Sequence, residues 1–239
     1  MNKNIILLHG AWHASWVWKY TLPKLQSYGF KVWAPHLPGH GSNIHYNFKD
    51  IEFQTYIDYI QSILEKMDGE VTLIGHSMAG IIISQIGELM PHKINKLIYL
   101  TGFVPDNNGS LASEEEKFRE KTVTNYTKVD IEENYIMVNP NYIPHLFYNK
   151  CKKEDIDFAT KLFQKQPLKP FVQQVNLTSS KFGQLPKAYI MCSEDQAILK
   201  EEQMSMASKI CCDLFEIDTD HSPFFSNNEE LCRLLNKII

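Results

Sequence analysis

The chain lacks the cysteine pattern of a disulfide-stabilised or zinc-stabilised protein. It has five cysteines, an odd number, and no two of them are spaced as C-x-x-C. A disulfide framework normally uses an even number, and a structural zinc site normally uses closely spaced pairs. We therefore predict reduced, mostly buried thiols and no metal site.

Long hydrophobic runs and a large excess of one charge are also absent. No apolar run is long enough to span a bilayer, and the N-terminal stretch MNKNIILLHGAW has no signal-peptide pattern. The formal net charge is −4 and the pI is near 6.1, which does not indicate a nucleic acid or membrane partner. We predict a cytoplasmic protein with a neutral small molecule as partner; the sequence leaves a homodimer open.

The chain does contain a regular alternation of short apolar runs and amphipathic stretches. Runs such as NIILLHG, EVTLIGHSMAG and INKLIYLTGF are typical of buried strands, whereas FQTYIDYIQSILEKM carries its apolar residues on one helical face. Strands and helices alternating at short intervals predict an α/β fold. Its central sheet should be mostly parallel and covered by helices on both faces.

This alternation stops after Pro105 and resumes near residue 185. The stretch between them is polar and charge-rich, with helical segments such as CKKEDIDFATKLFQKQ but no apolar parallel strand. We predict a core made of residues 1–105 and 185–239, interrupted by an inserted, mainly helical lid over residues 106–184. Such a lid would cover the C-terminal edge of the sheet, where α/β sheets bind ligands.

The stretch LIGHSMAG places a serine on a sharp turn between a strand and a helix. Ser77 lies between Gly75 and Ala79, directly after a predicted strand. A serine on such a turn stands above the sheet, at the positive N-terminus of the helix. The usual pattern is G-x-S-x-G; here the fifth position is Ala79, which is also small, with Gly80 following it. We predict that Ser77 is a nucleophile.

The first loop, within LLHGAWH, fits the same interpretation. His9 and Gly10 end the first predicted strand and open a loop. In this architecture that loop supplies one backbone N–H to the developing oxyanion, and the residue after the nucleophile supplies the other. The two predicted oxyanion donors are therefore the backbone amides of Ala11 and Met78.

A histidine near the end of the chain has the position of a general base. His221, in EIDTDHSPFFS, lies between the last predicted strand and the last helix. Ser77 and a late acidic residue also lie at strand ends, so all three should meet at one edge of the sheet. The chain order serine, acid, histidine is the order of α/β-hydrolases. We predict that His221 takes the proton of Ser77.

The acid that orients this histidine has more than one candidate. AYIMCSEDQAI ends a late strand in a turn that carries Glu194 and Asp195. We choose Asp195, with Glu194 as the near competitor and Asp106 as a weaker alternative. Asp218 and Asp220, just before His221, are interpreted as loop residues.

The substrate pocket is assigned to the first loop, the lid and the segment after His221. Trp12 and His13 lie beside the oxyanion loop, and Phe224 follows His221, so we predict that these three line the pocket. Seven aromatic residues of the lid are further candidates, although packing inside the lid explains most of them equally well: Phe118, Tyr126, Tyr135, Tyr142, Phe147, Phe158 and Phe163.

The chain resembles the α/β-hydrolases through four segments: LLHGAWHASWVWKYTLPKLQSYGFKVWAPHLPGHG, LIGHSMAG, AYIMCSEDQAI and DTDHSPFFSNNEEL. More narrowly, it resembles the plant methylesterase and hydroxynitrile lyase group and its bacterial carboxylesterase relatives. The resemblance runs nearly end to end and includes the lid stretch PHLFYNKCKKEDIDFATKLFQKQP. It implies an α/β-hydrolase fold, a triad at Ser77, Asp195 and His221, and oxyanion amides at Ala11 and Met78.

Within that group, the resemblance also separates the two reactions. Hydroxynitrile lyases of this fold carry a threonine in the first loop and a lysine just after the catalytic histidine. Here these positions hold Gly10 and Ser222, so a cyanide leaving group would lack its cationic partner. Lyase activity is disfavoured. Dehalogenases and epoxide hydrolases of this fold use an aspartate where Ser77 stands.

We predict a carboxylesterase-type serine hydrolase that cleaves a small, largely apolar carboxylic ester through an acyl-enzyme on Ser77. This mechanism needs no metal and no organic cofactor. Two alternatives stay open, because a fold alone does not fix the substrate. One is another hydrolase reaction on the same triad, as in a thioesterase, an amidase or a C–C hydrolase. The other is a small-molecule receptor with slow turnover.

Overall fold

Six parallel strands form the central sheet of the computed structural model, which describes residues 4–118 and 123–239. The strand order is β2-β1-β3-β4-β8-β9, and each neighbouring pair is parallel. All residues of β3 and β8 are buried, which explains their continuous apolar runs. The strands are β1 (Asn4–Leu8), β2 (Lys31–Trp33), β3 (Val71–His76), β4 (Ile94–Leu100), β8 (Lys187–Cys192) and β9 (Asp213–Ile217).

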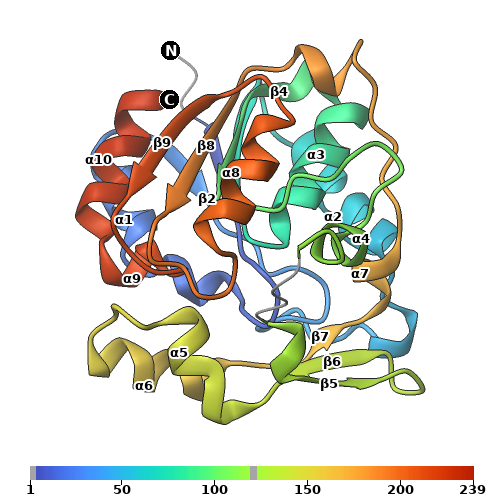
Figure 1. The fold of residues 1–239 in the computed structure, drawn as a ribbon. Coiled ribbons are helices and arrows are strands. Elements are labelled where there is room, and N and C mark those ends of the chain that lie inside the picture. Colours follow the sequence, from blue (N-terminus) through green and yellow to red (C-terminus); the bar gives the residue numbers. More distant parts are fainter. Residues whose placement is uncertain (1–3, 119–122) are drawn as a thin grey trace.

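Helices cover both faces of this sheet, as the sequence predicts. In Figure 1, α1 and α10 lie together on one side, and α2, α3 and α8 lie on the other. The apolar face of α2, with Tyr56, Ile60 and Leu64, is buried. These helices are α1 (Thr21–Ser27), α2 (Phe53–Glu65), α3 (Ala79–Leu89), α8 (Lys200–Ser208), α9 (Pro223–Ser226) and α10 (Asn228–Ile238).

The chain between β4 and β8, residues 101–186, is called the inserted segment. Residues 127–167 of this segment lie across the C-terminal ends of the strands, at the bottom of Figure 1, and the chain after them runs up the right side of the view. Besides helices, it contains a three-stranded antiparallel sheet, β5-β6-β7, that we did not predict. Its elements are α4 (Leu111–Glu115), β5 (Thr127–Asp130), β6 (Tyr135–Val138), α5 (Ile143–Phe147), α6 (Lys153–Leu162), β7 (Gln166–Pro167) and α7 (Lys169–Val172).

Short 3₁₀ turns complete the described secondary structure: Ser15–Trp18, Phe48–Asp50, Pro91–Lys93, Thr124–Tyr126, Pro140–Tyr142 and Phe182–Gln184.

A partly buried ion pair joins the inserted segment to the chain that follows the first loop. Lys19 Nζ lies 2.8 Å from Asp155 Oδ1, on α6, and 3.8 Å from the ring centroid of Phe158. The hydroxyl of Tyr20 donates to the same carboxylate oxygen at 3.1 Å. A cation over an aromatic ring is stabilised by about 1 kcal/mol or more when partly desolvated. These contacts hold α6 against the chain just before α1.

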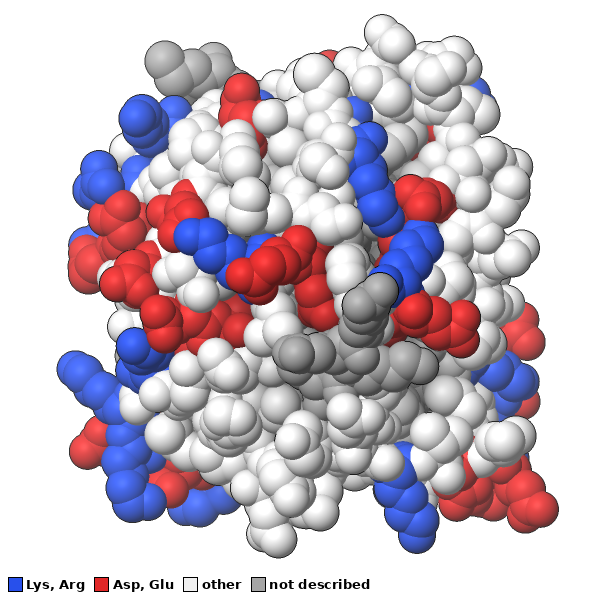
Figure 2. Space-filling model, in the orientation of Figure 1, with Lys and Arg blue, Asp and Glu red and all other residues white. Residues whose placement is uncertain are grey.

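Charged side chains do not form a patch of one sign on the face drawn in Figure 2. Acidic and basic side chains lie intermixed in a band above the inserted segment, and the segment itself presents mainly uncharged side chains at the centre of this face. The visible surface therefore gives no strong field that would steer a polyanion or a polycation toward it.

Candidate active site

The three residues predicted for catalysis all follow strands of the central sheet. Ser77 directly follows β3, Asp195 follows β8 and His221 follows β9. The strands are parallel, so their C-terminal ends lie at the same edge of the sheet. The inserted segment covers that edge (Figure 1).

The turn that carries Ser77 is sharp and has a left-handed backbone. Ser77 has φ +54°, a conformation that is costly for a residue with a side chain. Its amide donates to Leu100 O at 3.2 Å, and its carbonyl accepts from the amides of Gly80 and Phe103, both at 3.0 Å. A Cβ on Gly80 would collide with the backbone of Phe103. Gly80, one position after the small Ala79 of the motif, must therefore be glycine, and Gly75 is restricted in the same way by the backbone of Ala79.

His221 and Asp195 are in direct contact. Their Nδ1 and Oδ2 atoms are 2.7 Å apart, and both side chains are almost fully buried. Asp195 accepts three more short hydrogen bonds, from Thr101 Oγ1 at 2.6 Å and from the amides of Ala197 and Ile198 at 2.7 and 2.9 Å. These donors fix the carboxylate, and the carboxylate in turn fixes the orientation of the imidazole.

The two competing acids lie elsewhere. The side chain of Glu194 is 46% exposed and lies 3.6 Å from Lys150 Nζ. Asp106 forms ion pairs with two lysines. Among the three candidate acids, Asp195 is the one that contacts His221.

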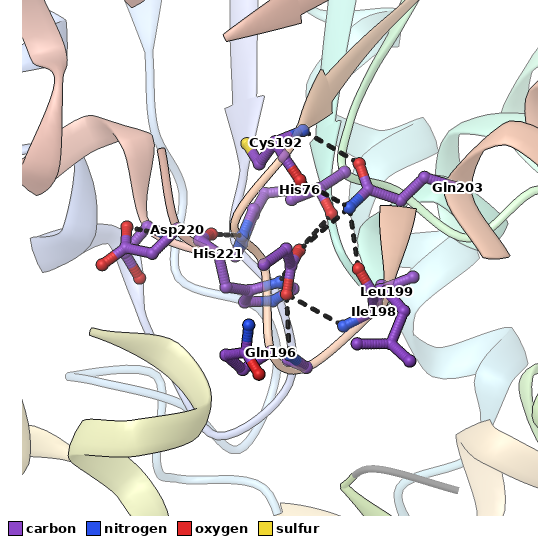
Figure 3. Close-up of polar contacts among 12 residues, drawn as sticks. His76, Cys192, Gln196, Ile198, Leu199, Gln203, Asp220 and His221 are labelled. Atoms are coloured by element: carbon purple, nitrogen blue, oxygen red, sulfur yellow. Dashed lines mark hydrogen bonds and ion pairs between the residues drawn. The ribbon is translucent and has the colours of Figure 1, made fainter. Parts of the chain in front are cut away.

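Gln203 on α8 supports the turn that carries Asp195, a role that we did not predict from the sequence. Its Oε1 accepts from the amide of Cys192 at 2.9 Å, and its Nε2 donates to the carbonyls of Cys192 and Ile198 at 3.0 and 2.7 Å. Figure 3 shows this amide bridging the end of β8 and the loop after it. A buried Gln within a helix carries no sequence motif, so only its contacts reveal the role.

His76, the residue before Ser77, forms a hydrogen bond to the backbone of His221. Its Nε2 donates to the carbonyl of His221 at 2.8 Å (Figure 3). Burial lowers the pKa of His76 well below 6.5, and the nearby His221 adds to this effect. A neutral imidazole with its proton on Nε2 is therefore the form that anchors the backbone of His221.

Asp220 lies in the loop between β9 and α9, as predicted, and its side chain is fully buried there. One oxygen accepts from Ser226 Oγ at 2.6 Å and from the amide of Ser222 at 3.0 Å. The other accepts from the amide of Lys150 at 2.8 Å and from Cys151 Sγ at 3.3 Å, both in the inserted segment. This carboxylate therefore joins the loop of His221 to the inserted segment.

The predicted oxyanion amides belong to two residues that lie beside Ser77. Among the hydrogen bonds of the described residues, neither the amide of Ala11 nor that of Met78 has an acceptor. Both residues line the same cavity as Ser77. Two unpaired N–H groups beside a serine are what an oxyanion needs.

The cavity beside Ser77 is small and mostly apolar. Its volume is about 20 Å³, room for about one water molecule. Trp12 lines it, as predicted, and Phe147 is the aromatic residue of the predicted lid set that reaches it. The lining consists of Ala11, Trp12, Ser77, Met78, Phe103, Leu111, Glu115, Val123, Phe147, Phe171, Ala197 and Ile198.

The other predicted pocket residues do not line this cavity. His13 is buried, and its Nε2 is bonded to the hydroxyl of Tyr148 at 2.6 Å. Phe224 is fully buried, and its ring packs against Trp18 and His76. Three of the aromatic lid candidates line a separate surface groove of about 610 Å³: Tyr126, Tyr135 and Tyr142.

Other features bear on the remaining predictions. All five cysteines are free. Residues 4–118 and 123–239 contain no group of three or more His, Cys, Asp or Glu residues that could hold a metal ion. In the same described part of the chain, no helix has the length and apolar character needed to cross a bilayer.

Comparison with known proteins assigns the family. The model described as "Alpha/beta hydrolase family" matches residues 5–234. The chain belongs to the alpha/beta hydrolase family, and the six-stranded parallel sheet is the fold expected for it.

Its curated relatives include plant esterases. Methylesterase 9 of Arabidopsis thaliana is 30% identical over 255 residues, covering 99% of this chain and 98% of the relative. Polyneuridine aldehyde esterase of Rauvolfia serpentina is 27% identical over 251 residues, covering 98% and 94%. The family and these relatives place the chain among the carboxylesterase-type hydrolases.

Solved structures agree with this assignment. A crystal structure of polyneuridine aldehyde esterase is 25% identical and superposes with a TM-score of 0.88, covering 100% of this chain and 99% of the other. A pyrethroid hydrolase has a TM-score of 0.89 at 21% identity, covering 99% and 96%. At that identity, the second comparison supports the fold alone.

Proposed function

We propose that this protein hydrolyses a small, largely apolar carboxylic ester through an acyl-enzyme on Ser77. The observation that carries the proposal is the 2.7 Å contact between Asp195 and His221, at the same edge of the sheet as the strained turn of Ser77. In this assignment Ser77 is the nucleophile, His221 the general base and acid, and Asp195 the orienting carboxylate.

The reaction would proceed in two half-reactions. The Ser77 oxygen forms a bond to the ester carbonyl carbon while His221 Nε2 accepts its proton. The amides of Ala11 and Met78 hold the oxyanion, and each such donor contributes about 3 kcal/mol. The C–O bond to the alcohol then breaks, and His221 returns the proton to the leaving oxygen. Water repeats the sequence on the acyl-enzyme and releases the acid.

The described walls of the cavity support an uncharged substrate. Among the residues that the structure describes, the lining includes no lysine or arginine, and aromatic and aliphatic side chains predominate. Such walls favour an ester without a free carboxylate, because a buried anion would meet no cation in the described lining. The names of the relatives, which include methylesterases, support a small alcohol as the leaving group.

The geometry at Gly10 supports a hydrolase rather than a hydroxynitrile lyase. A Cβ at this position would lie 2.8 Å from the Cβ of Ser77, so the lyase threonine would crowd the nucleophile. Ser222 is fully buried and has no charge to offer a cyanide ion.

The test is release of p-nitrophenol from p-nitrophenyl acetate and butyrate. We expect turnover by the wild type and by Ser62→Ala, a matched serine change on α2, and loss of turnover in Ser77→Ala by at least about 10³-fold. Equal rates in the wild type and Ser77→Ala would refute the assignment of the nucleophile. If the folded wild type binds such esters without releasing p-nitrophenol, the receptor alternative takes its place.

A further inference from the structure

The loop that carries the Ala11 amide, His9–His13, has a strained backbone. Trp12 has φ +62°, in the left-handed region that residues with side chains rarely adopt. A strained loop keeps its shape only where neighbouring groups hold it. The contacts that hold this loop therefore decide where the Ala11 N–H points.

His9 orients the peptide group between Gly10 and Ala11, which contains the Ala11 N–H. His9 Nε2 accepts from the amide of Leu37 at 3.1 Å, so its proton lies on Nδ1, which donates to Gly10 O at 2.9 Å. A trans peptide is planar, with its C=O and N–H pointing in opposite directions. Holding Gly10 O on the His9 side turns the Ala11 N–H away from His9.

The next peptide group, between Ala11 and Trp12, is held at both ends. Its carbonyl accepts from His13 Nδ1 at 2.6 Å, and its N–H donates to Gln166 Oε1 at 3.3 Å. His13 Nε2 is in turn bonded to the hydroxyl of Tyr148. Gln166 and Tyr148 both belong to the inserted segment, so this segment holds the loop on two sides.

The side-chain amide of Gln166 has a fixed orientation. Gln166 is fully buried. Its Nε2 donates to the hydroxyl of Tyr56 at 3.1 Å and to Pro167 O at 3.0 Å, and its Oε1 also contacts His40 Nε2 at 3.0 Å. With both amide hydrogens directed elsewhere, the oxygen is the atom that must face Trp12.

We propose that Gln166 is a positioning residue of the oxyanion hole. By accepting from the amide of Trp12, it keeps the strained turn closed and the Ala11 N–H directed at the oxyanion. The inserted segment then has a second role besides covering the site, because Gln166 on its β7 strand holds the first loop in place. This inference rests on the proposed esterase function.

The test compares Gln166→Met with Gln164→Met, a matched change two residues away. The side chain of Gln164 also bonds to a loop of the core, at Gly39 O and the amide of Gly41. The side chain of Gln164 makes no hydrogen bond to Trp12. The backbone amide of Gln164 donates to Trp12 O, and Gln164→Met keeps that backbone hydrogen bond. Gln166→Asn, which keeps the amide but withdraws it by one methylene, serves if Gln166→Met does not fold.

Two quantities report on the oxyanion hole rather than on stability. One is the split between kcat and KM on p-nitrophenyl butyrate. The other is the inhibition constant of an aryl trifluoromethyl ketone, whose adduct with a serine places an oxyanion in the hole. Both are measured well below the melting temperature of each variant.

We expect the Gln166 variants to lose about 10- to 100-fold in kcat, less than the 10²–10³ for a donor that is removed outright. KM should stay within about threefold and the inhibition constant should rise by the same factor as kcat falls, while Gln164→Met stays close to the wild type. Folded Gln166 variants with unchanged kcat, or an equal loss in Gln164→Met, would overturn the inference. Absence of Ser77-dependent turnover in the wild type would instead refute the proposed function.

Discussion

Four buried histidines around the site make the folded protein sensitive to mild acid. His9, His13, His40 and His76 are each at most 1% exposed. Burial lowers the pKa of His13 to about 3 and that of His40 to about 4, and lowers those of His9 and His76 well below 6.5. His13 and His40 are therefore neutral in the native protein at pH 5.5, and burial favours the neutral form of His9 and His76 as well.

The size of the effect follows from the difference between the folded and unfolded chains. Below the ordinary pKa of about 6.5, the unfolded state binds a proton at each of these histidines and the native state does not. Stability therefore falls as the pH falls. From pH 7.5 to 5.5, His13 and His40 each remove about 1.3 kcal/mol, or about 2.6 kcal/mol together, and His9 and His76 act in the same direction. Carboxylates with lowered pKa values, such as Asp106, act only below this window.

A loss of about 2.6 kcal/mol is a large part of the stability of many domains. The assay is urea unfolding followed by circular dichroism at pH 7.5 and 5.5. His40→Gln should reduce the difference in the free energy of unfolding between the two pH values by about 1.3 kcal/mol. His92→Gln, at an exposed position, should leave it unchanged. A free energy of unfolding that stays constant between these pH values, or rises in acid, would refute the reasoning.

Three substitutions test other contacts. Thr101→Val removes a hydrogen bond to the proposed catalytic carboxylate; kcat for p-nitrophenyl butyrate should fall about tenfold with little change in KM. Asp220→Ala leaves several buried donors unpaired, so urea unfolding should show a loss of about 3 kcal/mol, against less than about 0.5 kcal/mol for the exposed Asp218→Ala. Gly10→Thr crowds Ser77; esterase activity should fall about 100-fold, without cyanide release from mandelonitrile.

The fold could be predicted because its signals are local. Apolar runs such as NIILL and KAYIMC become buried parallel strands, and the interval without such runs becomes the inserted segment. The antiparallel sheet β5-β6-β7 was not predicted, because its strands have only four, four and two residues. Strands that short show no usable periodicity.

The candidate site could be predicted only where a motif or a strand end marks a residue. Ser77, Asp195 and His221 each follow a strand of the same sheet, so topology alone brings them to one edge. Thr101 and Gln203, which fix Asp195, have no motif, and Thr101 is 94 residues away from it in the chain.

Nearness in the sequence to a predicted site residue did not predict which side chains line the cavity beside Ser77. His13 and Phe224 are neighbours of predicted site residues, yet both are packed outside the cavity beside Ser77. The left-handed backbone of Trp12 changes the direction of the chain there, so adjacent side chains face different surroundings. A positive φ at a tryptophan has no signature in the sequence.

The most direct test of the central claim is to trap the acyl-enzyme. The protein is mixed with p-nitrophenyl acetate, quenched in acid within the first turnover, digested and analysed by mass spectrometry. We expect one acetyl group, on the peptide that contains Ser77, and none on that peptide in Ser77→Ala. Release of p-nitrophenol by the wild type with no adduct on Ser77, or with the adduct on another residue, would contradict it.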